Sequence, residues 1–391
     1  MNEIKIGMIG SSYGAFLHCD ALQYVGRIPF ALKTLCYNKR KAVAQEKKEK
    51  YGFEQITDDY RGMLADPEID VVDIVGPPLI HGRLIREALE SGKHVICEKP
   101  LTGYIPRAED PAPVGEKVPK LEMYRSVLSE MDALREAVKK SGKRFYYAEN
   151  FVYAPAVQKA GELIVRKKSK ILMMKAFFGM KGSSSPLAGD WAAFGGGCWY
   201  RNGVHPLSAI LWLKMQEGKA RGEEIYPVSV TADMGRVSEV LSEREHHHIA
   251  ARPLDVEDNS TVVITFSDGT KATVIVSDTV VGGSQNTVDV YTNDGALECR
   301  LVGSDALCTC FMDDEGLEDI TLSEMNPNKI GWNRAFVSDA LLRGYAGELR
   351  EFLSAIGEDR ESDLNFEFGY LVMKVIYAAY CAAEQRGAFT L

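Results

Sequence analysis

The hydrophobic pattern of residues 71–101 predicts a strand, a helix and a second strand in succession. A short apolar run over residues 71–75 breaks at Gly76-Pro77-Pro78, a helical pattern follows, and a second apolar run ends on Glu98-Lys99-Pro100. A parallel crossover needs this order and about this length. Ligands of such sheets bind beyond the carboxyl ends of the strands, so both proline segments are expected side by side at a ligand-binding edge. Lys99 is therefore the leading catalytic candidate.

Residues 4–18 have the pattern of a strand, a glycine-rich turn and a helix. The dinucleotide-binding pattern G-x-G-x-x-G would fall on Gly10, Ser12 and Ala15, so its middle glycine is replaced by a serine. The turn between strand and helix favours a pyrophosphate at the helix N-terminus. An ordinary tight turn between a strand and a helix is the alternative that the motif alone leaves open.

A second strand is expected near residues 30–35, followed by Cys36-Tyr37-Asn38-Lys39-Arg40. Dinucleotide-binding folds usually carry a carboxylate here, which grips the adenosine ribose, but these positions hold none. Asn38 can bond the ribose, whereas Lys39 and Arg40 can either meet a 2′-phosphate or be solvated. The sequence therefore leaves NAD and NADP both open.

The pattern changes after about residue 150 from alternating strands and helices to mostly strands. Before that point, residues 103–123 carry four prolines and are expected to form a surface loop near the mouth of the site, and a helix is expected over 124–141. Beyond it, strands are expected at 171–178, 226–234, 261–266, 270–276, 286–291 and 296–302, with hairpin turns at 267–269 and 293–295. One helix (204–213) crosses this antiparallel sheet, and two more (345–356 and 366–386) close the chain.

The composition indicates the general class of protein and excludes some classes of binding partner. A chain of 391 residues with 46% apolar and 26% charged residues is expected to form two domains. The net charge of −9 argues against nucleic-acid and membrane partners. No apolar run is expected to be long enough to span a membrane. No signal peptide is visible, and the eight cysteines show no CxxC pair. A cytoplasmic protein with reduced cysteines and no zinc site is expected.

Two segments of the second half carry candidate chemistry. Gly195-Gly196-Gly197 precedes aromatic residues, and His205 opens the helix at 204–213. His205 is either a catalytic group or merely part of the helix start. The run His246-His247-His248 is expected to be a solvated loop, because consecutive histidines cannot all face one ion.

Together these pieces resemble the Gfo/Idh/MocA family of sugar and cyclitol oxidoreductases. The resemblance rests on Gly7 to His18, Gly76-Pro77-Pro78-x-x-His81, Glu98-Lys99-Pro100, and Gly195-Gly-Gly197 followed by Gly203-x-His205. It implies that Lys99 and His205 flank the nicotinamide and handle the substrate hydroxyl. Burial beside a positively charged nicotinamide is expected to lower the pKa of Lys99, as is a protonated His205, so that the lysine can act as a base.

The sequence departs from the family pattern at two positions. The pattern Gly-Gly-Gly-x-Leu-x-Asp-x-Gly-x-His has its aspartate replaced by Arg201, and a second family aspartate is replaced by Ser208. Arg201 either faces the pocket, where it binds substrate or lowers the pKa of Lys99, or points away. The nearby aromatic residues Tyr153, Trp191, Trp199 and Tyr200 predict an aromatic-walled pocket, which would suit a glycoside as well as a free sugar.

These arguments give a set of predicted site residues. The catalytic residues are Lys99 and His205. The cofactor-binding residues are Gly10, Ser11, Ser12, Tyr13, Tyr37, Asn38, Gly76, Pro77, Pro78, His81, Glu98, Lys99 and Asn150. The substrate-binding residues are Tyr153, Trp191, Arg201, Asn202 and His205, and no metal ligand is predicted.

The predicted fold is α/β: a Rossmann domain over residues 1–150 and an α/β domain with a large, mainly antiparallel open sheet over 151–391, with the last helix packing back on the first domain. The predicted activity is NAD(P)-dependent oxidation of a ring secondary hydroxyl, preferably C3, of a sugar, cyclitol or glycoside. The alternatives are a glycosidase or lyase that uses NAD for transient oxidation, and an inactive sugar- or cofactor-binding sensor. Alternating residues such as Val288, Val290 and Tyr291 predict a homo-oligomer through the open sheet.

Overall fold

The computed structural model describes residues 3–302, 307–318, 320, 328–335 and 339–391. The chain divides into two compact units, each described by itself below. Unit 1 comprises residues 1–105, 125–153 and 344–374, and unit 2 comprises residues 106–124, 154–343 and 375–391. The division differs from the predicted boundary at residue 150, because residues 106–124 group with unit 2 and residues 344–374 with unit 1.

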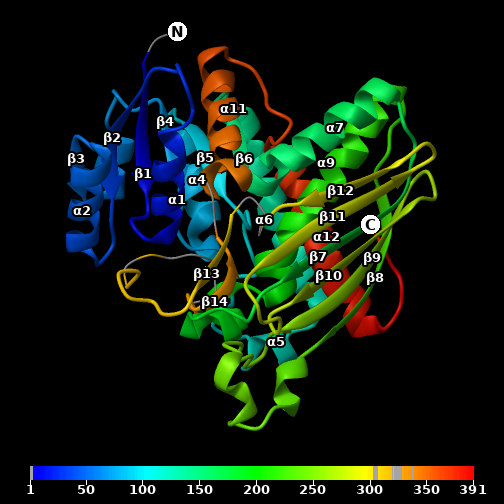
Figure 1. Cartoon of the computed structure of the whole chain (residues 1–391). Helices are drawn as coiled ribbons and strands as arrows, with labels where there is room; N and C mark the ends of the chain where they lie inside the picture. The colour runs from blue at the N-terminus through cyan, green and yellow to red at the C-terminus, as the bar shows by residue number, and fades with distance from the viewer. Residues whose placement is uncertain (1–2, 303–306, 319, 321–327, 336–338) are drawn as a thin grey trace. The chain divides into compact units, whose positions relative to one another are not determined.

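Unit 1 contains a parallel sheet, sheet A, in the strand order β3-β2-β1-β4-β5-β6 (Figure 1). Its strands are β1 (Ile4–Ile9), β2 (Phe30–Cys36), β3 (Gln55–Thr57), β4 (Val71–Ile74), β5 (His94–Glu98) and β6 (Phe145–Ala148). Its helices are α1 (Tyr13–Leu22), α2 (Lys41–Tyr51), α3 (Tyr60–Leu64), α4 (His81–Glu90), α11 (Tyr345–Gly357), most of α6 (Lys120–Ser141) and the first half of α12 (Phe366–Gln385). This is the Rossmann arrangement that the sequence predicts.

The crossover at residues 71–101 forms as predicted. All four residues of β4 are buried, as expected of a parallel strand covered on both faces. Helix α4 packs its buried Leu84, Ile85, Ala88 and Leu89 against the sheet. Because β1 pairs with β2 on one side and β4 on the other, the strand order reverses beside β1, and ligands of such folds bind at this point.

Unit 2 contains sheet B, in the strand order β12-β11-β7-β10-β9-β8-β15. Its strands are β7 (Ile171–Gly179), β8 (Pro227–Gly235), β9 (Asn259–Phe266), β10 (Lys271–Ser277), β11 (Gln285–Thr292), β12 (Ala296–Arg300) and β15 (Phe389–Thr390). The sheet is mainly antiparallel, as predicted, with β7 and β10 as a parallel pair. Both predicted hairpins form, joining β9 to β10 and β11 to β12.

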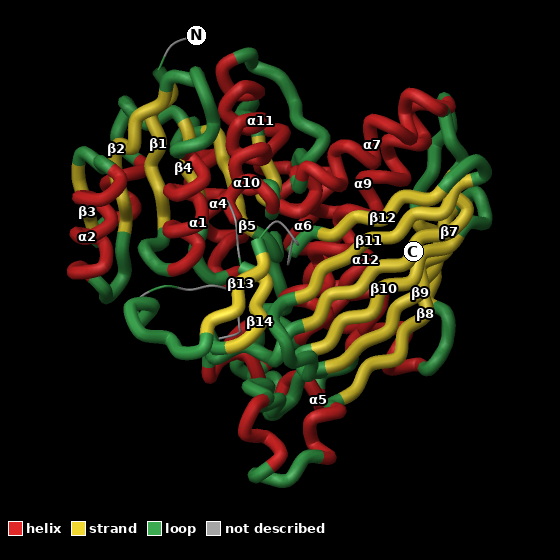
Figure 2. Tube along the Cα trace, viewed as in Figure 1, coloured by secondary structure: helices red, strands yellow, loops and turns green. Residues whose placement is uncertain are grey.

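Helices cover one face of sheet B, and the other face is open (Figure 2). Helix α9 (Val204–Arg221) packs on β7, β10 and β11, and it is longer than the predicted helix at 204–213. Helix α7 (Pro155–Lys167) packs beside it and was not predicted. The remaining elements of unit 2 are α5 (Val114–Lys117), α8 (Trp191–Phe194), α10 (Asp339–Leu342) and a small sheet of β13 (Cys308–Phe311) and β14 (Gly331–Arg334).

The prediction of a surface loop over residues 103–123 holds for residues 105–113, which form an irregular segment of exposed and half-buried residues, and is wrong for residues 114–123. Helix α5 occupies residues 114–117, and α6 already begins at Lys120. Val114 and Val118 are buried, and the backbone N–H of Gly115 donates to the Asp255 carboxylate at 2.8 Å. Pro113 precedes α5 and Pro119 lies between α5 and α6, and the segment still packs into unit 2.

One apolar stretch was missed at the sequence level. Helix α12 has an 18-residue window with a mean hydropathy of 1.2, which meets the length and composition of a membrane span. The stretch was overlooked because alanine and tyrosine dilute its apolar pattern. Of that window, 72% is buried within the protein, as in the core helix of a globular fold.

Candidate active site

The glycine-rich turn of unit 1 lies against the end of β4. Gly10 has a φ of +118°, and a Cβ at this position would lie 3.0 Å from the Val75 carbonyl oxygen. A Cβ at Gly14 would lie 3.1 Å from the same oxygen. Both positions therefore require glycine, for conformation at Gly10 and for space at Gly14.

The start of α1 fits the pyrophosphate of a dinucleotide. The helix begins at Tyr13, and the Ser12 side chain makes no capping hydrogen bond to it. Ser11 is buried in the turn, whereas Ser12 and Tyr13 are exposed. An exposed helix N-terminus after a tight glycine turn presents backbone N–H groups and a positive dipole end to an anion.

The end of β2 offers neutral groups to the ribose. Cys36 is buried, Tyr37 is half-buried with its N–H donated to the Thr57 carbonyl at 2.8 Å, and Asn38 is exposed. Asn38 is thus available for the predicted ribose contact. Together with the α1 terminus, these residues fit a dinucleotide.

His81 contacts both segments that are predicted to lie side by side, Gly76-Pro77-Pro78 and Glu98-Lys99-Pro100. Its ring is fully buried, with Nδ1 3.1 Å from the Pro100 carbonyl oxygen and Nε2 2.9 Å from that of Gly76. Burial lowers the pKa of His81. Since both nitrogens are engaged by the protein backbone, the geometry supports a bracing role for His81 and leaves Gly76, Pro77 and Pro78 as the predicted cofactor contacts on this loop.

Lys99 is fixed by its backbone at the end of β5. Its N–H lies 2.9 Å from Glu98 Oε2 and 3.1 Å from the Ala148 carbonyl oxygen, so the strand-end geometry is held from two sides. The residue is half-buried. Glu98 also lies 3.1 Å through Oε1 from Nε2 of the buried His18. Glu98 therefore contacts protein groups through both oxygens.

Asn150 and Tyr153 follow β6 on a short 3₁₀ turn, Asn150–Tyr153. Asn150 is buried. The Tyr153 hydroxyl lies 3.0 Å from Ser362 Oγ, and its ring packs edge-on against Phe352 with 5.7 Å between ring centroids. These contacts hold Tyr153 inside unit 1 and favour a packing role over the predicted substrate contact.

In unit 2, the three consecutive glycines lead into α9. Gly195 and Gly196 have positive φ angles, and a Cβ at Gly197 would lie 2.1 Å from the Glu257 carbonyl oxygen. A π-helical turn over Trp199–Gly203 then joins α9, whose second residue is His205. The His205 ring is nearly buried and stacks on Phe178 at 5.8 Å. The glycines thus mark a close backbone approach.

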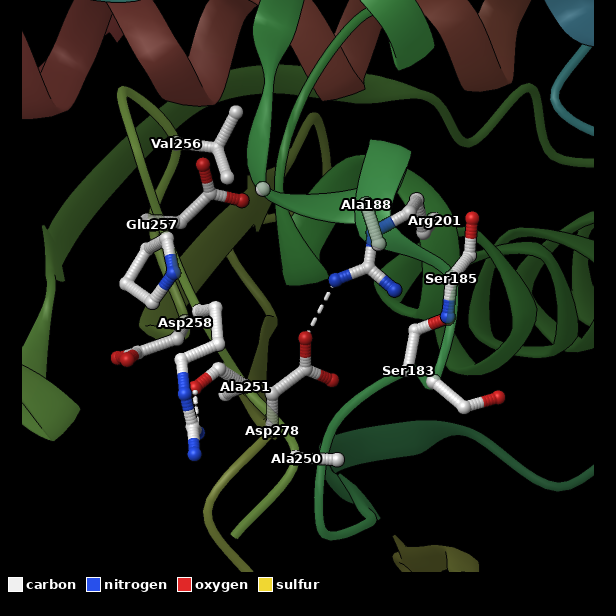
Figure 3. A pocket seen from close by; sticks show the side chains of 14 residues that line it. Ser183, Ser185, Ala188, Arg201, Ala250, Ala251, Val256, Glu257, Asp258 and Asp278 are labelled. Carbon is white, nitrogen blue, oxygen red and sulfur yellow. Dashed lines mark hydrogen bonds and ion pairs between the residues drawn. The ribbon is translucent and has the colours of Figure 1, made fainter. Parts of the chain in front are cut away.

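A polar cavity of about 330 Å³ lies in unit 2 (Figure 3). Arg201 points into it and forms a buried ion pair with Asp278, whose other oxygen accepts from Asn202 Nδ2 at 3.1 Å. Burial disfavours the charge of Arg201, but the Asp278 carboxylate outweighs this and raises the pKa of the guanidinium. Arg201 therefore faces a pocket, which is one of the two orientations left open by the sequence.

The rest of the cavity wall mixes polar residues with small apolar ones. Its other lining residues are Ser183, Ser184, Ser185, Ala188, Gly189, Ala250, Ala251, Arg252, Pro253, Val256, Glu257 and Asp258. Glu257 is buried, and burial raises its pKa to about 7 against the opposing hydrogen bonds from the Trp199 N–H and the Tyr380 hydroxyl. Paired cations, carboxylates and hydroxyls give this wall both donors and acceptors.

The predicted aromatic wall is not found around this cavity. Trp199 and Tyr200 are completely buried, and the Trp199 indole N–H donates to the Ile376 carbonyl at 3.0 Å. Trp191 lines a different cavity of unit 2, of about 310 Å³, together with Lys120. Aromatic residues after a glycine run are equally typical of a packed core, and Trp199 and Tyr200 are core residues here.

Neither the histidine run nor the cysteines form a metal site among the described residues. His246, His247 and His248 lie on a 3₁₀ turn, with His246 Nε2 2.9 Å from the Ser238 carbonyl oxygen. All eight cysteines are free, six of them buried and Cys308 and Cys310 exposed. Within the described ranges, no group of three or more His, Cys, Asp or Glu side chains is arranged to hold a metal ion.

Sequence reasoning missed several ionisable residues near the predicted site. Asp73 had a visible signal, since it is the single charged residue in the apolar run of β4. Glu149 stands directly before the predicted Asn150 and belongs to no motif of its own. Asp278 and Glu348 gave no signal, because their surroundings come from segments distant in sequence.

Both halves of the chain match one family. Residues 4–112 match the NAD-binding Rossmann fold of the Gfo/Idh/MocA oxidoreductase family, and residues 158–298 match the C-terminal domain of the same family. A levoglucosan dehydrogenase from Pseudarthrobacter phenanthrenivorans is 25% identical, with 95% of this chain and 94% of the relative aligned. A myo-inositol 2-dehydrogenase from Thermotoga maritima is 20% identical over 99% of this chain and 98% of the relative.

Solved structures share the fold over the whole chain. Levoglucosan dehydrogenase in complex with NADH and levoglucosan superposes with a TM-score of 0.72 at 21% identity, covering 100% of this chain and 99% of that one. GenD2 from gentamicin A biosynthesis, in complex with NAD, gives a TM-score of 0.79 at 20% identity, covering 100% and 97%. At this level of identity the likeness establishes the fold.

Proposed function

The chain belongs to the Gfo/Idh/MocA family of NAD-binding oxidoreductases, and from this premise we propose that it oxidises a ring secondary hydroxyl of a sugar, cyclitol or glycoside. C3 of a glucosyl unit is the preferred position, since oxidation there also acidifies C2. The observation that carries the proposal is Lys99, whose backbone is anchored at the carboxyl end of β5 in a Rossmann fold with a fitting dinucleotide cradle.

The chemistry divides between cofactor and protein. Bound NAD supplies the hydride acceptor. The protein must take the hydroxyl proton, and the family resemblance assigns this to Lys99 and His205. Fixing a base in place contributes about 10²- to 10⁴-fold to rate in general acid–base catalysis. The Glu98 carboxylate and the Ala148 carbonyl, which both accept from the Lys99 N–H, serve this positioning.

The Arg201–Asp278 cavity is the part of unit 2 that we assign to substrate binding. A guanidinium donates hydrogen bonds and a carboxylate accepts them, so the pair suits adjacent hydroxyl groups. The names of the two relatives, a levoglucosan and a myo-inositol dehydrogenase, support polyhydroxylated ring substrates. The cavity wall lacks a stacked aromatic surface, which favours a free sugar or cyclitol over an aryl glycoside.

The test is turnover of a substrate panel by the purified protein with NAD and, separately, NADP. Levoglucosan, myo-inositol, glucose and methyl glucoside are the probes, and absorbance of the reduced nicotinamide is the measurement. We expect reduction with at least one probe and a loss of at least about 100-fold in kcat for Lys99→Ala. Glycoside cleavage without reduced nicotinamide would instead support the glycosidase or lyase. NAD binding without either reaction would support the sensor.

A further inference from the structure

Five ionisable side chains are buried together in unit 1, at the carboxyl ends of the strands that lead to Lys99. They are His18 on α1, Asp73 on β4, Glu98 on β5, Glu149 after β6 and Glu348 on α11, and we call them the buried acid cluster. Each is at most 9% exposed. Four carboxyl groups cannot all be ionised in such surroundings at a tolerable cost, so the cluster must retain protons at neutral pH.

His18 supplies the positive charge of the cluster. Its Nδ1 lies 2.8 Å from Asp73 Oδ2 and its Nε2 lies 3.1 Å from Glu98 Oε1. Two carboxylates accept from both ring nitrogens only if the ring is an imidazolium. Burial opposes this charge, but Asp73 and Glu98 together raise the pKa of His18 well above its usual value. Asp73 and Glu98 are thereby both paired with His18.

Glu149 is placed level with Lys99 on the neighbouring strand. Glu98 pairs with Ala148 in the parallel register, and the Lys99 N–H donates to the Ala148 carbonyl at 3.1 Å. The next residues, Lys99 and Glu149, therefore leave adjacent strand ends on the same side. Glu149 is fully buried and accepts from the Phe151 N–H at 3.4 Å.

The charges of Glu149 and Lys99 interact. Burial raises the pKa of Glu149 to about 8, with the Lys99 ammonium opposing this shift and Glu98 adding to it. The carboxyl group therefore gains and loses its proton near neutral pH. Such a group, adjacent to an amine, is able to exchange a proton with it at little cost.

Glu348 is not suited to the same exchange. Its side chain is completely buried, and neither carboxyl oxygen has a hydrogen-bond partner among the described residues. Burial raises the pKa of Glu348 well above its usual value, with His18 opposing this and Glu98, Glu149 and Asp73 adding to it. Burial therefore favours the protonated form of Glu348, and Glu149 is the member of the cluster that is placed beside Lys99.

We propose that Glu149 accepts the proton that Lys99 takes from the substrate hydroxyl. One N–H bond of the Lys99 ammonium breaks, one O–H bond forms on Glu149, and the amine regains its lone pair; no electrons change hands in this step. Glu149 acts on the reaction only through Lys99, whose proton it accepts, and it is therefore a positioning residue rather than a catalytic residue. The proposal rests on the proposed role of Lys99.

The first experiment follows Glu149 without any substrate. An infrared pH titration of the whole protein measures the carboxyl stretch of protonated acids. We expect a band that disappears with a midpoint near pH 8 in the wild type, persists unchanged in Glu348→Gln, and is missing in Glu149→Gln. In Lys99→Met its midpoint should move to higher pH, because the opposing positive charge is gone. A wild-type titration identical to that of Glu149→Gln would overturn the proposal, whichever sugar is the substrate.

The second experiment uses the best probe from the substrate panel. The wild-type kcat for oxidation should rise with pH to a midpoint near 8, whereas Glu149→Gln should lose about 100-fold in kcat and lose this midpoint, with the KM for NAD changed less than about twofold. Glu348→Gln should keep the midpoint. Should Glu149→Gln fail to fold, Glu149→Asp retains a carboxylate and should keep the pH dependence. An unchanged pH profile in a folded Glu149→Gln protein would refute the role.

Discussion

Glu348 illustrates how a single buried acid affects stability. Its folded pKa is raised mainly by burial, so its contribution to the free energy of unfolding is full below the pKa of an unfolded glutamate, about 4.3, and is lost as pH rises toward the folded pKa. Glutamine has the same shape and does not ionise in the unfolded chain. We therefore expect Glu348→Gln to raise the urea midpoint relative to the wild type, more at pH 8 than at pH 5.

The control for this comparison is Glu90→Gln, at an exposed position near the end of α4. It should leave the urea midpoint nearly unchanged at both pH values, since exposed side chains seldom alter stability. A Glu348→Gln protein with a lower midpoint at pH 8 than the wild type would mean that this carboxyl group is ionised and stabilising in the folded state.

At the same scale, the sequence predicted the position of Lys99 but not its surroundings. The strand–helix–strand pattern determines where Lys99 falls in the sheet, and this needs only local periodicity. The ion pair of Arg201 with Asp278 joins residues 77 positions apart, and Glu348 reaches its neighbours only once α11 has packed. Partners of this kind depend on tertiary packing, which a hydrophobic pattern does not specify.

Among the elements, α7 and α9 meet at a glycine. A Cβ at Gly161 would lie 2.5 Å from two ring carbons of Trp212, a nearly buried side chain of α9. Alanine would favour the helix by about 1 kcal/mol, but overpacking typically costs about 1–3 kcal/mol. We expect Gly161→Ala to lower the melting temperature, as measured by circular dichroism.

Two further variants check this explanation. Gly235→Ala, where nothing lies within 4 Å of the added methyl group, should leave the melting temperature nearly unchanged. Adding Trp212→Phe to Gly161→Ala should recover part of the loss, because the smaller ring makes room. If the double variant recovers none of the melting temperature, the loss does not come from the contact between α7 and α9.

Elements with a strong local period were predicted well, and elements without one were missed. The alternating strands β9, β10 and β11 match within two residues at each end. Strand β3 has only three residues, and α7 begins at a proline, Pro155. The helical start at Lys120 was hidden by the prolines before it. Short length and proline context, both of which weaken periodicity, account for these differences.

For the whole molecule, the division at residue 150 captured the change of pattern but not the path of the chain. The chain returns to unit 1 at residue 344, and α12 begins in unit 1 and ends in unit 2. A sequence pattern identifies elements in order, whereas a compact unit is defined by contacts between segments far apart.

The open face of sheet B carries the prediction of self-association through Tyr291, whereas the predicted Val288 and Val290 are fully buried and lie on the opposite face of β11. Met173 and Tyr291 are paired across β7 and β11 and are 50% and 37% exposed, and the outward Phe177 and Ile275 are half-buried beside them. An apolar patch on an open sheet favours a second copy of the chain.

We expect sedimentation equilibrium to show an oligomer that Met173→Glu weakens at least tenfold, whereas Leu254→Glu, at an exposed apolar position outside the sheet, does not. Since each copy has a net charge of −9, added salt should strengthen the association by screening repulsion. A wild-type protein that sediments as a monomer at every concentration would rule out this use of the sheet.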